Sequence, residues 1–198
     1  MGKAKIGISD LQFAVLKDDI VSGEVIKLPG TTEAKLELTM DIATLPADNV
    51  PYLTVSSGIS EAKLTLNNYD VNSEVKKALY GIDVINGIEI YDKKLLPNDV
   101  VIMYKTALDD GKEIYVAMLK GKFTLPGMNS KTTGDGAPDP ETDEIEGSFV
   151  ARKVGDRDVI LLIGRSDVAG FNFEEFKKVV FPATAEEAVI PTPSEPAV

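Results

Sequence analysis

The carboxylates between Asp135 and Glu146, in the stretch DGAPDPETDEIE, have the residue types of a metal site. Asp135, Asp139 and Glu146 stand at the first, fifth and twelfth positions of a twelve-residue calcium loop, which binds the ion through oxygen atoms. However, Ala137 occupies the third position, and Pro140 occupies the sixth, where the loop needs glycine for its sharp turn. The spacing argues against calcium, and we expect neither a metal nor a cofactor.

Catalytic chemistry is restricted by two missing residue types, because the 198 residues include no histidine and no cysteine. Ser-His-Asp and Cys-His catalysis are therefore excluded. Val168 stands where a nucleophile elbow needs its second glycine, and GDGAPD lacks the third glycine of a dinucleotide loop. A pair among the 32 acidic residues could resemble a glycosidase site, but so many carboxylates make such a pair unspecific. We predict that the chain is not an enzyme.

Charge and hydropathy limit the partners. The chain has 21 Lys and Arg against 32 Asp and Glu, a formal charge of -11, whereas binding nucleic acid requires clustered basic residues. The longest apolar runs, IYVAML and VILLI, are too short to span a membrane, and the first residues lack the apolar segment of a signal peptide. We therefore expect synthesis in the cytoplasm, no membrane contact and no specific binding of DNA.

Alternation of apolar and polar residues between turn signals predicts about ten strands and one or two helices. The order of elements has no βαβ rhythm, which favours an antiparallel β-sandwich or barrel-like fold with a flanking helix. Ser73 before an apolar stripe and Gly81 after it predict a helix over residues 73–80, and NFEEFKKVV predicts a shorter one. We expect one domain over residues 1–181 and a flexible, proline-containing tail over residues 182–198.

Two segments between Glu33 and Leu66 alternate cleanly, which predicts the two strands of a hairpin. Even-numbered residues are apolar in both and should face the core: Ala34, Leu36, Leu38, Met40 and Ile42 in the first, and Ala62, Leu64 and Leu66 in the second. Leu53 and Val55 have the opposite parity, so the second strand cannot keep both sets on one face without an extra residue. We predict a bulge or kink at Ser57–Gly58, where glycine accepts unusual dihedral angles.

A series of segments in a fixed order carries a family resemblance. These are IGISDLQFAVLKDD, VIKLPGTTEAKLEL, ATLPADN, AKLTLNNYDVNSEVKKALYG, VAMLKGKFTLPGMNSKTTGD and DEIEGSFVAR. Together they resemble the major tail proteins, or tail tube proteins, of phages with long flexible tails, over the chain up to about Phe181. One departure is Pro46, where the family frequently has an aromatic residue.

The resemblance implies a virion protein that assembles with itself into hexameric rings, which stack into a tube that conducts DNA. It also implies tape-measure, tail-terminator and distal-tail proteins as partners. In the family the tip of the long hairpin lies at a contact between rings, and here that tip comprises Leu45, Pro46, Ala47, Asp48, Asn49 and Val50. Because this tip is mostly apolar, exposure on a lone subunit would have no benefit, which also favours a stacking role.

The polar face of the hairpin is expected to line the lumen. Its charged residues are Glu33, Lys35, Glu37, Asp41, Glu61 and Lys63. Four carboxylates against two ammonium groups would repel DNA, so that it slides and does not bind. An ordinary solvated strand face accounts for the same alternation, and the residues alone leave both readings open.

The segment Asn129–Asp143 is broken by Gly134, Gly136, Pro138 and Pro140, so it should form no regular element. We expect it to reach a neighbouring subunit through polar side chains, those of Asn129, Lys131, Asp135, Asp139, Glu141 and Asp143. A disordered surface loop is the alternative.

Two other functions of the protein also stay open: the tube of another injection device, such as a phage-tail-like bacteriocin or a secretion system, and a carbohydrate-binding β-sandwich.

Overall fold

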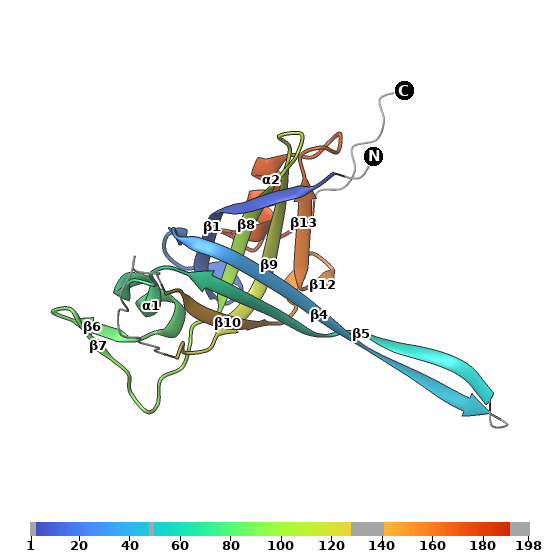
Figure 1. Ribbon diagram of the computed structural model, residues 1–198, viewed down its shortest axis with the longest axis horizontal. Helices are drawn as coiled ribbons and strands as arrows, with labels where there is room; N and C mark the ends of the chain where they lie inside the picture. Colours follow the sequence, from blue (N-terminus) through green and yellow to red (C-terminus); the bar gives the residue numbers. More distant parts are fainter. Residues whose placement is uncertain (1–2, 48–49, 128–140, 191–198) are drawn as a thin grey trace, which may run out of the picture.

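The computed structural model describes residues 3–47, 50–127 and 141–190, and every pairing between the described strands is antiparallel (Figure 1). The elements in chain order are β1 (Lys5–Lys17), β2 (Ile20–Val21), β3 (Ile26–Lys27), β4 (Thr31–Ala47), β5 (Val50–Asn68), α1 (Ser73–Tyr80), β6 (Asp83–Ile85), β7 (Ile88–Ile90), β8 (Val100–Leu108), β9 (Glu113–Phe123), β10 (Asp143–Phe149), β11 (Arg152–Val154), β12 (Arg157–Val159), β13 (Leu161–Arg165) and α2 (Phe173–Val180). The predicted mainly β, antiparallel fold with a helix at residues 73–80 is confirmed.

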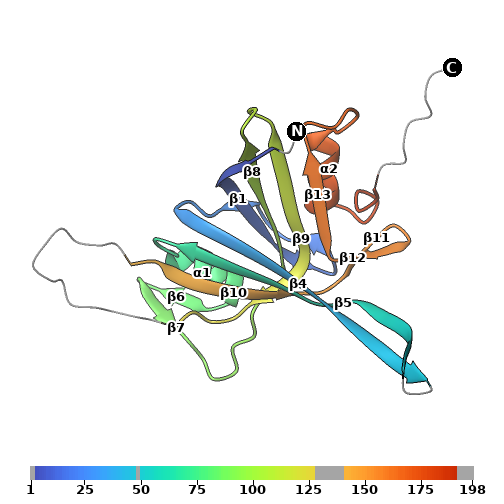
Figure 2. The same cartoon turned by 45° about the vertical axis from the view of Figure 1, so that its right-hand side comes forward.

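The largest sheet has the strand order β2-β1-β8-β9-β10-β5-β4, with β13 also paired to β9 and β3 to β1. One edge of β9 pairs with β8, and the other is divided between two strands. Residues 114–118 pair with β13, and residues 121–123 pair with β10. The sheet thus separates at the end of β9 into two layers, and β4, β5 and β10 run across β1, β8 and β9 (Figure 2). Its two end strands do not pair, so no closed barrel forms among the described residues.

Two cores result from this arrangement. The larger core lies between the two layers and is closed by α1; it includes Phe13, Leu64, Val75, Ile102 and Met118, each at most 2% exposed. The smaller core lies on the other face of β1, β8 and β9, where α2 covers it. Strands β8 and β9 are therefore buried on both faces, which explains why their apolar runs are nearly continuous.

The separation of the layers depends on a close approach between β9 and β10. Gly121 pairs with Phe149, and Gly147 pairs with Phe123. A Cβ atom added at Gly121 would lie 2.6 Å from the carbonyl oxygen of Ser148 and would clash with the ring of Phe149. The two phenylalanine rings meet edge to face, with centroids 5.8 Å apart. Glycine is thus required at Gly121 by the space available rather than by an unusual backbone conformation.

Both helices have capping side chains. In α1 the side chain of Asn72 accepts a hydrogen bond from the amide of Val75, so the N-cap is Asn72 and not Ser73, which begins the helix. The helix ends as predicted at Gly81, whose left-handed φ of 71° suits a residue without Cβ. In α2 the side chain of Asn172 accepts from the amides of Glu174 and Glu175. Short polar side chains are favoured at N-caps because they satisfy free amide groups.

A buried cation holds the C-terminal end of α2 against the sheet. The side chain of Arg152 is 1% exposed, and its guanidinium donates hydrogen bonds to the carbonyl oxygens of Leu119, Val179 and Val180. Burial lowers the pKa of Arg152 to about 10. The last carbonyl groups of a helix carry partial negative charge, so they compensate the guanidinium in place of a carboxylate.

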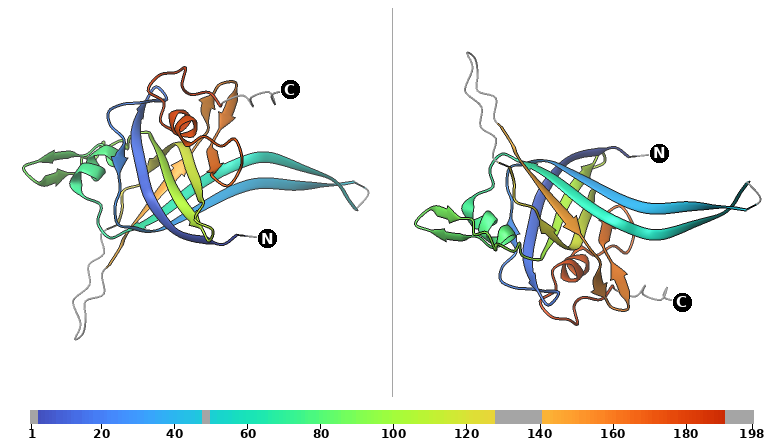
Figure 3. Two further views of the ribbon diagram at one scale, coloured as in Figure 1. Left: turned by 90° about the horizontal axis from the view of Figure 1, so that it is seen from above. Right: turned by 90° about the horizontal axis from the view of Figure 1, so that it is seen from below.

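Strands β4 and β5 form a hairpin that extends far beyond the body (Figure 3). Close to the body its apolar face packs as expected: Leu64 and Leu66 are fully buried, and Ala34 and Leu36 contact the core. Farther out, Leu38, Met40 and Ile42 are 42%, 51% and 65% exposed. The prediction that these three residues face the core is therefore wrong, because the body does not reach that part of the hairpin.

The irregularity predicted at Ser57–Gly58 is present, but the expectation that it brings Leu53 and Val55 onto the face of Leu64 is wrong. Along β4 and β5, Thr39 pairs with Glu61, Met40 with Ile59 and Ile42 with Ser56. Between Glu61 and Leu53, strand β5 therefore contains two extra residues, one at Ser60 and one at Ser57–Gly58, where Gly58 has φ of 82°. Two insertions restore the original parity, so Leu53 and Val55 lie opposite Leu45 and Ala43, on the face away from Leu64.

The described part of the C-terminal segment contacts the body. The carbonyl oxygen of Pro182 accepts a hydrogen bond from Val21, and that of Ala188 accepts one from Gly155. The boundary at residue 181 stays a prediction, and residues 191–198 lie outside the described residues.

We predict that Gly121→Ala destabilises the subunit by about 1–3 kcal/mol, because the added methyl group must displace the ring of Phe149 or the backbone of β10. Urea unfolding followed by circular dichroism measures the change. Gly127→Ala is the matched control, because a Cβ atom there meets nothing within 4 Å. Equal stabilities of the two variants would contradict the close approach.

The same type of substitution should affect stability differently in the inner and outer parts of the hairpin. Leu64→Asp should unfold the subunit, since the charge would be buried without a partner, whereas Ile42→Asp should leave it folded, since that side chain is 65% exposed. Thermal melting curves of both variants give the comparison. A folded Leu64→Asp variant would show that the assigned core face is wrong.

Candidate functional site

The six charged residues predicted to share a face do so. Lys35 pairs with Thr65, Glu37 with Lys63 and Thr39 with Glu61, so these side chains project from one side of the hairpin. Glu33 and Asp41 have the same parity on β4. Lys35 and Glu37 form an ion pair at 2.7 Å, which is exposed to solvent. The structure therefore contains a continuous polar surface over the inner hairpin.

This polar face is wider than the sequence indicated. Strand β10 lies beside β5, with Glu146 opposite Thr65 and Ser148 opposite Lys63, and Lys122 of β9 lies opposite Ser148. Glu146 pairs with Lys63 at 3.2 Å. Glu144, Glu146 and Lys122 thus join the six predicted residues, and the face carries six carboxylates and three ammonium groups, a net charge of -3. Alternation in DEIEGSF is the signal that could have identified the two glutamates.

The outer part of the hairpin is apolar and exposed. We define the outer hairpin as residues 38–47 of β4 and 50–60 of β5. Its large hydrophobic side chains are 40% to 78% exposed: Leu38, Met40, Ile42, Leu45, Val50, Tyr52, Leu53, Val55 and Ile59. Within the predicted tip, Leu45, Pro46 and Val50 are exposed, while Asp48 and Asn49 lie outside the described residues. An exposed apolar surface of this kind usually marks a contact with a partner.

Most of the predicted inter-subunit segment lies outside the described residues, including Asn129, Lys131, Asp135 and Asp139. Glu141 is described and exposed, and Asp143 begins β10, where it pairs with Asn68 of β5. The proposed contact of this segment with a neighbour therefore stays a prediction.

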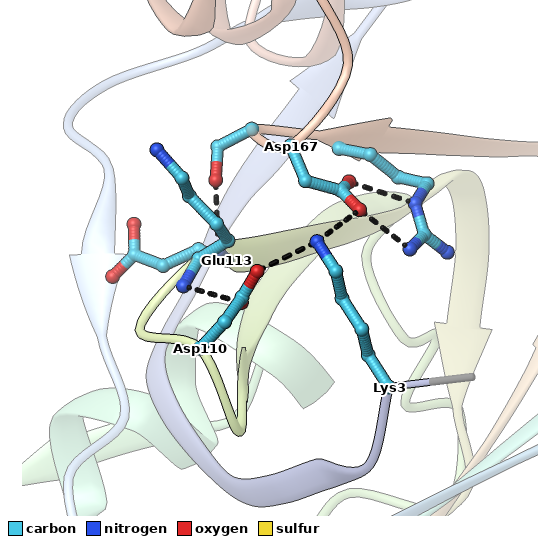
Figure 4. Close-up of polar contacts among 7 residues, drawn as sticks. Lys3, Asp110, Glu113 and Asp167 are labelled. Carbon is cyan, nitrogen blue, oxygen red and sulfur yellow. Dashed lines mark hydrogen bonds and ion pairs between the residues drawn. The ribbon is translucent and has the colours of Figure 1, made fainter. Parts of the chain in front are cut away.

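A cluster of charges that sequence reasoning missed joins the N-terminal end to two loops (Figure 4). The ammonium group of Lys3 lies 2.6 Å from Asp110, in the turn between β8 and β9, and 3.1 Å from Asp167, which follows β13. Arg165 donates two hydrogen bonds of 3.0 Å to Asp167. Nearby, the hydroxyl group of Ser166 accepts a hydrogen bond from the amide of Glu113. These residues are far apart in sequence, so no local pattern identifies them.

The charges in this cluster shift one another's pKa. Arg165 and then Lys3 lower the pKa of Asp167, and Lys3 lowers that of Asp110. A neighbouring pair behaves similarly: burial and a hydrogen bond to Glu113 raise the pKa of Tyr115 to about 12. The lowered pKa of Asp167 and of Asp110 favours their ionised carboxylates, as expected for groups held in ion pairs.

No group of three or more acidic side chains is arranged to hold a metal ion in residues 3–47, 50–127 and 141–190. In the same part of the chain no helix is long and apolar enough to cross a membrane. The surfaces that stand out are therefore the polar face and the outer hairpin.

The family described as phage tail tube protein matches residues 27–189. No curated protein matches the chain. Among solved structures, the chain is similar to one from the sheath–tube complex of an extracellular contractile injection system in its extended state. That similarity has 14% identity and a TM-score of 0.43, and it covers 78% of this chain and 87% of the other.

The charge cluster predicts an acid-dependent stability. The lowered pKa of Asp167 and Asp110 stabilises the fold above the ordinary aspartate value of 3.8, and this contribution is lost as the pH falls through the folded-state pKa. Asp167→Asn should therefore flatten the decrease of the unfolding free energy between about pH 5 and pH 2. Urea titrations at several pH values measure the slope.

The matched control for this loss of charge is Asp156→Asn, in the exposed turn between β11 and β12. An unchanged slope in the Asp167→Asn variant would show that the cluster does not contribute to acid sensitivity.

Proposed function

The chain belongs to the phage tail tube protein family and is a structural subunit of a tail tube, and we propose that six copies close into a ring. The rings stack around a lumen through which DNA passes. The observation that carries this proposal is the β4–β5 hairpin, which combines a free strand edge, an acidic polar face and an exposed apolar extension. Each of these three features has a role in a tube and none in an isolated subunit.

Ring closure is supported by the edge of the sheet. In the described part of the chain β4 is paired only on its β5 side, so the other side leaves backbone amide and carbonyl groups available over its inner residues. Natural proteins seldom leave a long strand edge uncovered, because it pairs readily with other chains. In a ring, each subunit pairs this edge with the next, and no edge is left at the end.

We assign the lumen to the polar face of the inner hairpin and β10. Its carboxylates outnumber its ammonium groups, so six copies surround DNA with negative charge. Like charges disfavour binding to phosphate groups, which lets DNA pass without adhering to the wall. The proposed lumen residues are those predicted from the sequence, from Glu33 to Lys63, together with Lys122, Glu144 and Glu146.

The contacts between rings are assigned to the tip Leu45–Val50, supported by its apolar composition and by its distance from the body. The segment Asn129–Asp143 adds a second, polar contact to a neighbouring subunit, which should weaken as salt concentration increases.

We further propose that the tube binds a tape-measure protein inside and terminator and distal-tail proteins at its ends. Its subunits are made in the cytoplasm of the host, become part of the virion tail and have no catalytic role.

The test is electron microscopy of the purified protein at high concentration. The wild-type protein should form rings or hollow tubes, and a persistent monomer would contradict ring assembly. The variant in which a glycine bridge replaces Leu45–Val50 should stay folded but form no long tubes, because the apolar contact between rings is removed. Tubes of normal length from this variant would show that the tip has no stacking role.

A further inference from the structure

The outer hairpin has two apolar faces, because even-numbered and odd-numbered positions of β4 both carry apolar side chains there. Met40, Ile42 and Ile59 continue the face that carries Leu36 and Leu64 in the body. Leu45 opposite Leu53 and Ala43 opposite Val55 form the other face, which carries Lys35 and Glu37 nearer the body. A hairpin that rests on one partner needs a single apolar face, and a hairpin between two partners needs two. The exposed residues are thus distributed as if both faces were covered.

The edges of the outer hairpin are unsuited to strand pairing. Pro46 lies opposite Pro51, and proline has no amide hydrogen to donate. On the β5 side, the bulges at Ser60 and at Ser57–Gly58 interrupt the regular spacing of backbone groups. Both features are devices that block the addition of a further strand. The apolar side chains of the outer hairpin project from its faces and not from its edges, so a partner covers them through the faces.

We propose that the outer hairpin is clamped between two further copies of this chain, one on each face. This inference rests on the tube assembly proposed above and adds that the hairpin acts as an inner layer between two subunits. Replacing the apolar side chains of either face with polar ones should therefore impair assembly.

Each subunit has a second exposed apolar cluster, and we infer that one of the two neighbouring copies contacts the outer hairpin through it. The β6–β7 hairpin and the loop after it expose Ile85, Ile88, Ile90, Tyr91 and Leu96, which are 43% to 80% exposed. This cluster lies at the end of the molecule opposite to the outer hairpin, so the two cannot meet within one subunit (Figure 1). A head-to-tail contact buries both at once, and such heterologous contacts generate rings or stacked arrays.

The charges beside these apolar residues are compatible with this contact. The outer hairpin has the acidic residues Asp41 and Asp48 and no Lys or Arg. The opposite cluster exposes Asp83 and Asp92 as well as Lys93 and Lys94, and the two lysines lie at its Leu96 end, which is therefore the end suited to the acidic hairpin. Complementary charge at the rim of an apolar contact favours the correct orientation of the two partners.

The absence of native cysteine allows a direct test with single cysteines. Ile42→Cys labels one face and Val55→Cys the other, and maleimide labelling is measured in dissociated subunits and in assembled tubes. Both cysteines should react about tenfold more slowly in tubes, because the centre of an interface excludes water. The wild-type protein is the unlabelled control. If either cysteine reacts in tubes as fast as in dissociated subunits, its face is free and the proposal is wrong.

A photoreactive residue placed at position 42 or 55 identifies the partner surfaces. Peptides captured in tubes from the two positions should differ, and one set should come from residues 82–96. Capture of the same peptides from both positions, or of none from residues 82–96, would overturn the proposal. If the wild-type protein forms no tubes, the proposed function fails instead, so the two failures are distinguishable.

Discussion

The architecture depends on the close approach of β9 and β10 at Gly121. There β9 leaves the layer it shares with β8 and β13 and joins the layer of β10, β5 and β4. The absence of a side chain lets the ring of Phe149 lie across the strand, and the edge-to-face contact with Phe123 holds the two strands in register. The position of the second layer over the core follows from this contact, as does the direction in which the hairpin leaves the body.

The hydrophobic effect acts at two levels in this chain. Within the subunit, the apolar face of the inner hairpin is buried under β1, β8 and β9, which stabilises the fold without any contribution from the outer hairpin. The exposed apolar residues of the outer hairpin have the same chemistry, but nothing in residues 3–47, 50–127 and 141–190 buries them. The inner hairpin thus stabilises the subunit, and we assign the outer hairpin to assembly. This division suits a subunit that folds before it polymerises.

The charges of the polar face contribute little to the stability of the subunit. Its ion pairs, Lys35 with Glu37 and Lys63 with Glu146, are exposed to solvent and contribute little to the free energy of folding. Their effect is to distribute charge along the surface while leaving a net negative value. In the lumen that we propose, local pairing would reduce repulsion between subunits, and the remaining carboxylates would repel the phosphate groups of DNA.

The sequence by itself determined the elements and several of their ends. Alternation predicted the strands, Gly81 marked the end of α1, and the glycine at position 58 marked the bulge at Ser57–Gly58. These are local properties, because side-chain direction and backbone preference depend on neighbours in the chain. The cap of α1 differed, since Asn72 and Ser73 are both good capping residues and the choice depends on one turn of backbone.

The tertiary structure decided which apolar residues are buried in the subunit. Leu36 and Ile42 belong to the same alternating pattern, yet Leu36 contacts the core and Ile42 is exposed. Likewise, no local signal joins Lys3 to Asp167, or Lys122 to the polar face of the hairpin. Periodicity reports which side of a strand is apolar, whereas burial depends on how far segments distant in sequence extend over that side.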